Sequence, residues 1–186
     1  RLLSSAASDV YKRQIKGEFG NEVADLVDGV TKISVLENKA SSNSKAENFR
    51  KLILATSKDI RVLLVKIADR LHNMRTIKAI TKEDKRKRIA QETMEIYAPL
   101  ADRMGMHRIR DELEDLSFEI LNNQARSLIQ KRLDEIKLDK KDIFKSLSLE
   151  LKDLLIKNNI KSDIFGREKT PFSIWRKVQK KRVSLE

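Results

Sequence analysis

The chain has 186 residues, of which 40% are hydrophobic and 37% are charged, and its formal net charge at pH 7 is +12. This composition predicts a soluble folded protein with one good core or two small ones, and five glycines with two prolines favour long helices. The absence of cysteine excludes disulfides, thiolate zinc sites and a cysteine nucleophile, and it fits a reducing cytoplasm. No run of about eighteen apolar residues is present, so we expect no membrane span.

Residues 1–14 differ in pattern from the rest of the chain. They have no clear apolar period and no signal-peptide layout of charged, apolar and small-residue zones. They resemble a translated adapter-like string found at the broken ends of some assembled environmental sequences. We therefore predict that residues 1–14 are a non-native tail. Reading the source DNA across the junction of Gln14 and Ile15 tests this, and a continuous native reading frame would contradict it.

Apolar residues recur at helical spacing in three stretches between residues 23 and 79. They predict a short buried helix around residues 23–30, a helix over about residues 46–56 and a central helix over about residues 60–79. Residues 40–46, rich in Ser and Asn, are expected to form a loop between the first two. The central helix is predicted to bury Ile60, Leu63, Leu64, Ile67, Leu71 and Met74.

The opposite face of the central helix carries polar groups in line, at Lys66, Asp69, Asn73 and Thr76. A carboxylate such as that of Asp69 can hold a metal ion, and an amide and a hydroxyl can orient a ligand. The same spacing also fits the ordinary solvated face of an amphipathic helix. Spacing alone leaves both interpretations open.

Two further helices are predicted over about residues 92–104 and 108–121. Pro99 should kink the first of them or mark its restart, and Gly105 can supply the left-handed residue that ends it. The highly charged residues 125–159 keep apolar positions at helical spacing, which predicts a helical pair or a bent helix with solvated charges.

The last thirty residues contain nine Lys/Arg against three Asp/Glu. Residues 160–165 are the first plausible strand, and Thr170 can then cap a helix that begins at Pro171. Two cations in the turn and a hydroxyl and a cation on the helix could grip a triphosphate, or they could form a basic surface turn. These four residues are Arg167, Lys169, Ser173 and Lys177.

Identity, rather than periodicity, favours one interpretation of these patterns. The string from Lys66 to Thr76, preceded by Ala46 to Lys51 and Asp59 to Val62, resembles the long RelA/SpoT family of enzymes, which make and destroy (p)ppGpp. The resemblance runs from about Phe19 to the last residues. It implies a mainly α fold: the remnant of an HD-domain-type helical bundle, connecting helices, and the first strand and helix of an α/β pyrophosphoryltransferase domain.

The resemblance implies that the first part belongs to an Mn2+-dependent hydrolase, which removes the 3′ pyrophosphate of (p)ppGpp with two His and two Asp as metal ligands. Asp69 resembles the last of these ligands, Asn73 a nucleotide contact and Thr76 a residue near the guanine. The family's other ligands include a His-Asp pair, and this chain has no His-Asp dipeptide. Its only histidines, His72 and His107, are expected to be structural or surface residues. We therefore predict that the chain does not hydrolyse (p)ppGpp.

The resemblance also implies that the last part opens a synthetase domain, which transfers pyrophosphate from ATP to GDP or GTP. Arg167, Lys169, Ser173 and Lys177 match its opening motif, where the Arg meets the ATP and the others meet phosphates. Synthesis further requires an acidic residue that binds Mg2+, and the family carries it beyond the point matched by Glu186. We predict that synthesis is absent as well.

The sequence thus predicts an internal fragment of a cytoplasmic bifunctional enzyme. Residues 15–85 would belong to the hydrolase, residues 86–159 to connecting helices and residues 160–186 to the synthetase. Its partners would be nucleotides, with the ribosome a further candidate for the parent, and neither DNA nor a membrane is expected. The alternative is a basic helical module that binds RNA, ribosome or protein without catalysis, although aromatic residues for stacking make up only 5% of the chain.

Overall fold

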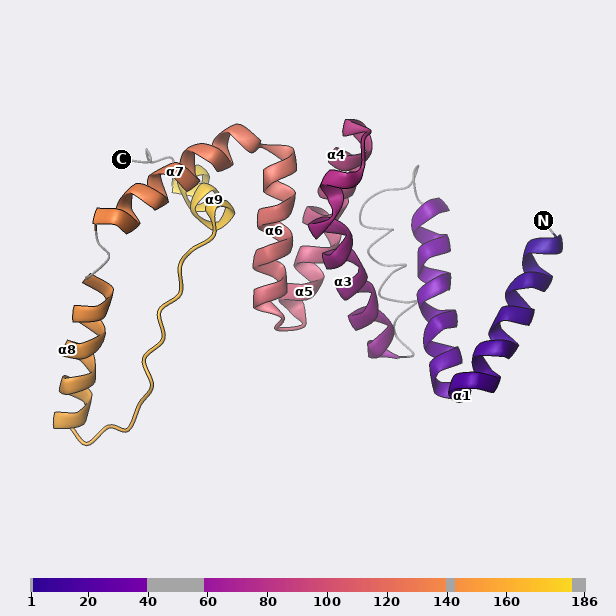
Figure 1. The fold of residues 1–186 in the computed structure, drawn as a ribbon, viewed down its shortest axis with the longest axis horizontal. Coiled ribbons are helices and arrows are strands. Elements are labelled where there is room, and N and C mark those ends of the chain that lie inside the picture. Colours follow the sequence, from indigo (N-terminus) through magenta and orange to yellow (C-terminus); the bar gives the residue numbers. More distant parts are fainter. Residues whose placement is uncertain (1, 40–58, 140–142, 182–186) are drawn as a thin grey trace. The chain divides into compact units, whose positions relative to one another are not determined.

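The computed structural model describes residues 2–39, 59–139 and 143–181. Every regular element in these residues is helical, which confirms the predicted mainly α fold (Figure 1). The chain forms two compact units, Arg1–Leu113 and Glu114–Glu186, and each is described by itself. None of the helices in the described ranges has the length and apolar character needed to cross a membrane.

The first unit begins with α1 (Leu2–Lys39), which is bent at Gly20. Gly20 has a φ of 85°, which a residue without a Cβ adopts at little cost. Figure 1 shows α1 as two arms joined by a bend. Lys12 Nζ lies 3.0 Å from Asp28 Oδ2 and links the arms. Residues 2–14 are therefore helical, and whether they are native stays a prediction. The predicted helix at residues 23–30 is part of α1, while the predicted loop at 40–46 and helix at 46–56 lie outside the described residues.

The central helix is α3 (Ile60–Arg75), followed by the short 3-10 helix η1 (Ile77–Ala79). Asp59 caps its start, because its carboxylate accepts a hydrogen bond of 2.9 Å from the backbone N–H of Arg61. The predicted buried face is partly wrong, since Ile60 is 58% exposed and Leu64 is 38% exposed. The residues that α3 buries instead form a rotated stripe, which consists of Val62, Leu63, Lys66, Ile67, Arg70, Leu71 and Met74.

Contacts with α1 help to set this rotation of α3. Gly29 of α1 lies so close to Val62 that an added Cβ would stand 2.7 Å from Val62 Cγ2. Only a glycine fits this contact without displacing Val62, and a β-branched side chain has little freedom to move aside. The helical spacing alone could not reveal this close approach.

We expect Gly29→Ala to lower the free energy of unfolding by about 1–2 kcal/mol, because overpacking outweighs the gain in helix propensity. Denaturant unfolding followed by circular dichroism measures the change. Gly17→Ala is the matched control in the same helix, since nothing lies within 4 Å of its added Cβ, and it should be neutral or stabilising. Equal effects of the two substitutions would contradict the close contact.

The next stretch runs continuously through α4 (Glu83–Glu92), the π-helical turn η2 (Thr93–Tyr97) and α5 (Ala98–Arg103). Pro99 stands in the first turn of α5, which confirms that it marks a restart of the helix. A wider π turn accommodates the ring, which cannot donate to the preceding turn. Gly105 follows α5 with a φ of 72° and ends it as predicted.

Helix α6 (His107–Leu121) leads into the second unit, which contains α7 (Asn123–Asp139), α8 (Ile143–Lys157) and α9 (Pro171–Lys181). The predicted helical pair is confirmed by α7 and α8. The predicted strand at residues 160–165 is wrong, because these residues are irregular. A strand is stabilised by ladder hydrogen bonds, and the described residues provide no neighbouring strand.

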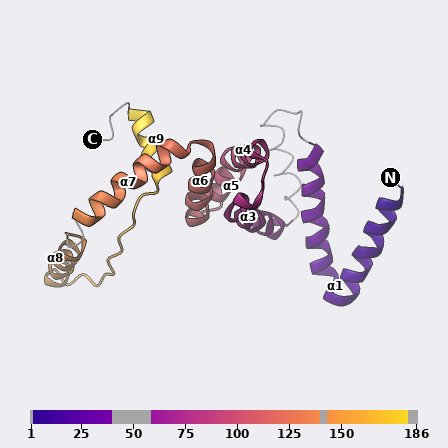
Figure 2. The same ribbon diagram turned by 45° about the horizontal axis from the view of Figure 1, so that its top comes forward.

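An aromatic cluster forms the core of the second unit. The ring centroid of Phe118 lies 5.5 Å from that of Phe172 and 5.2 Å from that of Trp175. Helices α7 and α9 lie side by side (Figure 2), and Ile129 of α7 is only 2% exposed. Thr170 caps α9 as predicted, since its Oγ1 accepts a 3.3 Å hydrogen bond from the N–H of Ser173.

Candidate functional site

The three residues predicted to serve a hydrolase lie on the C-terminal half of α3. Asp69, Asn73 and Thr76 are all exposed, on successive turns of one side of the helix. Thr76 ends α3, and its hydroxyl donates a 3.0 Å hydrogen bond to the carbonyl of His72. The structure thus brings these residues into one row, with the side chain of Asp69 51% exposed.

Lys66 was predicted to share this solvated face, and that prediction is wrong. Its side chain is only 6% exposed, and its Nζ lies 3.8 Å from Asp69 Oδ2. One turn of helix separates the two residues, so their side chains reach the same edge of α3. The burial follows from the rotation of α3, which turns Val62, Lys66 and Arg70 inward together.

Arg70, the residue after Asp69, is a second buried cation. Its Nη1 donates a 3.1 Å hydrogen bond to Glu92 Oε2, and its guanidinium carbon lies 4.1 Å from the centroid of the Tyr97 ring. A guanidinium stacked on an aromatic ring and paired with a carboxylate holds a fixed position. Arg70 therefore fastens α3 to α4 and η2. Sequence reasoning missed this contact, because a helical pattern does not tell which charged residue flanks the buried stripe.

The side chains in the described residues do not fit a resident divalent metal ion. No group of three or more His, Cys, Asp or Glu side chains comes together within these ranges. Asp69 would contribute a single carboxylate, whereas protein sites for such cations combine several ligands. The donor set of the described residues therefore does not fit the Mn2+ that the family resemblance implies.

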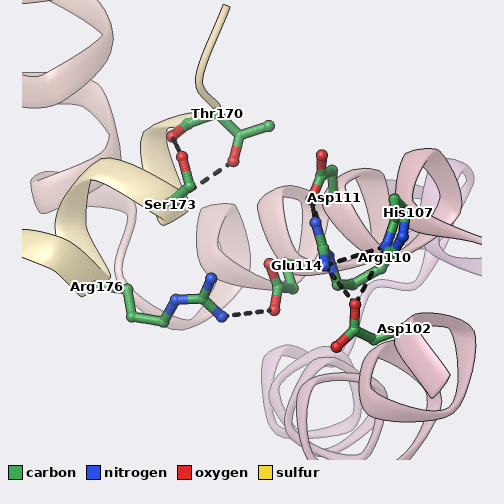
Figure 3. A network of polar contacts seen from close by, with 8 residues as sticks. All are labelled: Asp102, His107, Arg110, Asp111, Glu114, Thr170, Ser173 and Arg176. Carbon is green, nitrogen blue, oxygen red and sulfur yellow. Dashed lines mark hydrogen bonds and ion pairs between the residues drawn. The ribbon is translucent and has the colours of Figure 1, made fainter. Parts of the chain in front are cut away.

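Neither histidine belongs to a group of three or more His, Cys, Asp or Glu side chains within the described residues. His72 is exposed on α3. His107 Nδ1 lies 3.3 Å from Asp102 Oδ1, and Arg110 also contacts Asp102 and, at 2.6 Å, Asp111 (Figure 3). The hydrogen bond from Arg110 lowers the pKa of Asp102 from its usual value of 3.8. This network stabilises the turn between α5 and α6.

The residues predicted to bind phosphates stand at the start of α9. Arg167 and Lys169 are exposed in the irregular segment before it, and Lys177 is exposed one turn beyond Ser173. The hydroxyl of Ser173 donates a 2.8 Å hydrogen bond to the carbonyl of Thr170 (Figure 3). The structure therefore places Ser173 and Lys177 on one side of the helix, and the other two cations in the approach to it.

Arg176 is a residue of this region that sequence reasoning missed. Its Nη1 lies 3.3 Å from Glu114 Oε1 (Figure 3), and its guanidinium carbon lies 5.7 Å from the ring centroid of Phe172. Glu114 is buried, so the pair fixes the side of α9 that faces the core. The pair leaves Lys177, the next residue, on the exposed side.

A bidentate ion pair joins the C-terminal end of α3 to α6. Arg75 Nε and Nη2 donate to the two carboxylate oxygens of Glu112, at 2.6 and 2.9 Å. The hydrogen bond from Arg75 lowers the pKa of Glu112 from its usual value of 4.5. The stabilisation is therefore present above about pH 4.5 and is lost as the pH falls through the lower folded-state pKa.

We expect Glu112→Gln to lower the midpoint of thermal unfolding near neutral pH, and its difference from the unaltered chain to narrow as the pH falls below about 4.5. Both groups are partly solvated, so the effect should be small. Thermal melts across this pH range measure it. Glu18→Gln removes an exposed carboxylate of α1 and is the control. A difference for Glu112→Gln that stays constant with pH would contradict the assignment.

Comparison with known proteins shows which protein family the chain belongs to. The family model of the HD domain matches residues 2–107, which include all of α3. The chain therefore belongs to the HD-domain family.

The chain is similar to relatives of the RelA/SpoT type, which confirms the resemblance that the motif indicated. The chain is 46% identical over 175 residues to the GTP pyrophosphokinase rsh of Brucella melitensis, covering 94% of this chain and 23% of the relative. It is 44% identical over 168 residues to the guanosine-3′,5′-bis(diphosphate) 3′-pyrophosphohydrolase of Haemophilus influenzae, covering 90% and 25%. A GTP pyrophosphokinase of Myxococcus xanthus is 43% identical over 171 residues, covering 90% and 22%. The chain thus spans about a quarter of the length of these relatives.

Proposed function

We propose that this chain is part of an enzyme of (p)ppGpp metabolism in the cytoplasm. The observation that carries the proposal is the row of Asp69, Asn73 and Thr76 on α3, inside the region matched by the HD-domain model. The names of the relatives support both halves of such an enzyme, because one is a pyrophosphohydrolase and others are GTP pyrophosphokinases.

In the hydrolase half, residues 15–85, we assign Asp69 as a ligand of the family's Mn2+. Asn73 would contact the nucleotide, and Thr76 would lie near the guanine. Exposure of all three side chains supports these roles, since each can meet a ligand from solvent. The chain itself should not release pyrophosphate from ppGpp, because its described residues supply one carboxylate where several ligands are needed.

In the synthetase half, residues 160–186, Arg167 would meet ATP, while Lys169, Ser173 and Lys177 would meet phosphates. Residues 86–159 would connect the two halves. Phosphoryl transfer relies on positioned cations and Mg2+ around the phosphates, and α9 offers only the first of these. We therefore expect no transfer of pyrophosphate from ATP to GDP or GTP by this chain.

A basic binding module without catalysis is the second candidate. The surplus of Lys and Arg in the last thirty residues favours it, and the cations before and along α9 are exposed. Such a module would bind RNA mainly through phosphate neutralisation, so its affinity would fall steeply with salt. Its affinity for RNA would also not depend on the polar row of Asp69, Asn73 and Thr76 on α3.

Equilibrium binding of ppGpp and of a single-stranded RNA to the same chain separates the two functions. We expect Asn73→Ala to weaken ppGpp binding about fivefold, the worth of one hydrogen bond, and to leave RNA binding unchanged. Gln91→Ala, at an exposed site on α4, is the control. Salt-sensitive RNA binding together with ppGpp binding that ignores Asn73 would favour the basic module instead.

A further inference from the structure

Lys66 is a buried cation at the edge of the polar row on α3. Its side chain is 6% exposed, although its neighbour Asp69 is 51% exposed. A buried ammonium group is costly to remove from water and is normally paired with an opposite charge. The Asp69 carboxylate, 3.8 Å away, provides one such charge.

A divalent cation bound to Asp69 would have to lie close to this ammonium group. Like charges a few ångströms apart repel one another strongly in a partly buried setting. Lys66 lies one turn before Asp69 on the same helix, so its ammonium group is within reach of the carboxylate when α3 is folded. Lys66 is therefore a second reason, besides the shortage of ligands in the described residues, why a metal ion would bind weakly at Asp69.

We propose that Lys66 is a counter-ion of Asp69 in this chain and opposes the binding of a divalent cation to that carboxylate. This inference rests on the proposed role of Asp69 as a ligand. Lys66 thereby holds the carboxylate in place without a metal ion, and it weakens the binding of any metal ion there. If Lys66 only supported the helix, its substitution would leave Mn2+ binding unchanged or weaken it. As a counter-ion of Asp69, its substitution by an uncharged residue should strengthen Mn2+ binding.

The test is Mn2+ titration of the 186-residue chain, followed by paramagnetic broadening of the backbone amide NMR signals of Asp69, Arg70 and Asn73. We expect Lys66→Met to shift the broadening to about tenfold lower Mn2+ concentration, because a neighbouring positive charge is removed. Lys66→Arg, which keeps the charge, should behave like the unaltered chain. Lys85→Met removes an exposed charge from α4 and is the control. Lys66→Gln replaces Lys66→Met if the latter fails to fold.

Two results would contradict the counter-ion role of Lys66, and they differ in whether Asp69 is still a metal ligand. If Lys66→Met binds Mn2+ no more tightly while Asp69→Asn still weakens binding, Asp69 is a ligand but Lys66 is not its counter-ion. If broadening near Asp69 is unaffected by Asp69→Asn in every variant, the ligand role in the proposed function fails too. In the expected result, Lys66→Met binds Mn2+ more tightly than the unaltered chain, and Lys66→Met/Asp69→Asn loses this gain. That result supports both the ligand role of Asp69 and the counter-ion role of Lys66.

Discussion

Phe118→Ala is expected to lower the free energy of unfolding of the second unit by about 3–5 kcal/mol. Phe118 is 2% exposed and contacts both Phe172 and Trp175, so its removal leaves a cavity between α6 and α9 and ends two aromatic contacts. Trp175 is the sole tryptophan of the chain, and its fluorescence therefore reports on this core directly. Denaturant titration should show its emission shift to the red at a lower midpoint.

Phe165→Ala is the matched control for this prediction. Phe165 is 89% exposed in the irregular segment before α9, and its removal should change stability by no more than about 0.5 kcal/mol. An unchanged midpoint in Phe118→Ala would contradict the aromatic cluster as the core of the second unit. It would also remove the support for the position of Ser173 and Lys177, which α9 carries.

Arg70→Ala is expected to destabilise the first unit by about 2–4 kcal/mol. The substitution leaves the Glu92 carboxylate without its 3.1 Å hydrogen bond and uncovers the face of Tyr97, which is 1% exposed in the folded chain. Arg70→Lys should lose part of this, because an ammonium group keeps the charge but not the planar stacking. Unfolding followed by circular dichroism measures both variants.

Arg88→Ala, at an exposed position of α4, provides the comparison for Arg70→Ala. It should change the free energy of unfolding by no more than about 0.5 kcal/mol. Equal losses for Arg70→Ala and Arg88→Ala would contradict the role of Arg70 in fastening α3. Such a result would mean that the apolar stripe alone holds the helix.

Local signals in the sequence predicted much of the helical framework. Thr170 with Pro171 predicted the start of α9, Gly105 predicted the end of α5 and Pro99 predicted a restart. These signals succeed because capping, left-handed backbone and a missing N–H act within one turn of the residue itself. The string from Lys66 to Thr76 likewise indicated the family through the identity of its residues.

Features that depend on distant residues could not be predicted in this way. The rotation of α3 follows from Gly29, Glu92 and Tyr97, which a helical period does not include. Helical spacing alone therefore places Lys66 on the solvated face and indicates no role for Arg70, although both are buried. The prediction of a strand at residues 160–165 is wrong for the same reason, since a strand forms only beside a neighbouring strand.

We propose that Asp69 is a metal ligand in the hydrolase half of a (p)ppGpp enzyme. The most direct test is Mn2+-dependent release of pyrophosphate from ppGpp by this chain with a family-type upstream segment grafted ahead of Ile15. We expect the graft to release pyrophosphate and the same graft with Asp69→Asn to release none. A folded graft that is inactive, or one that is active regardless of Asp69, would contradict the hydrolase assignment and favour the basic binding module.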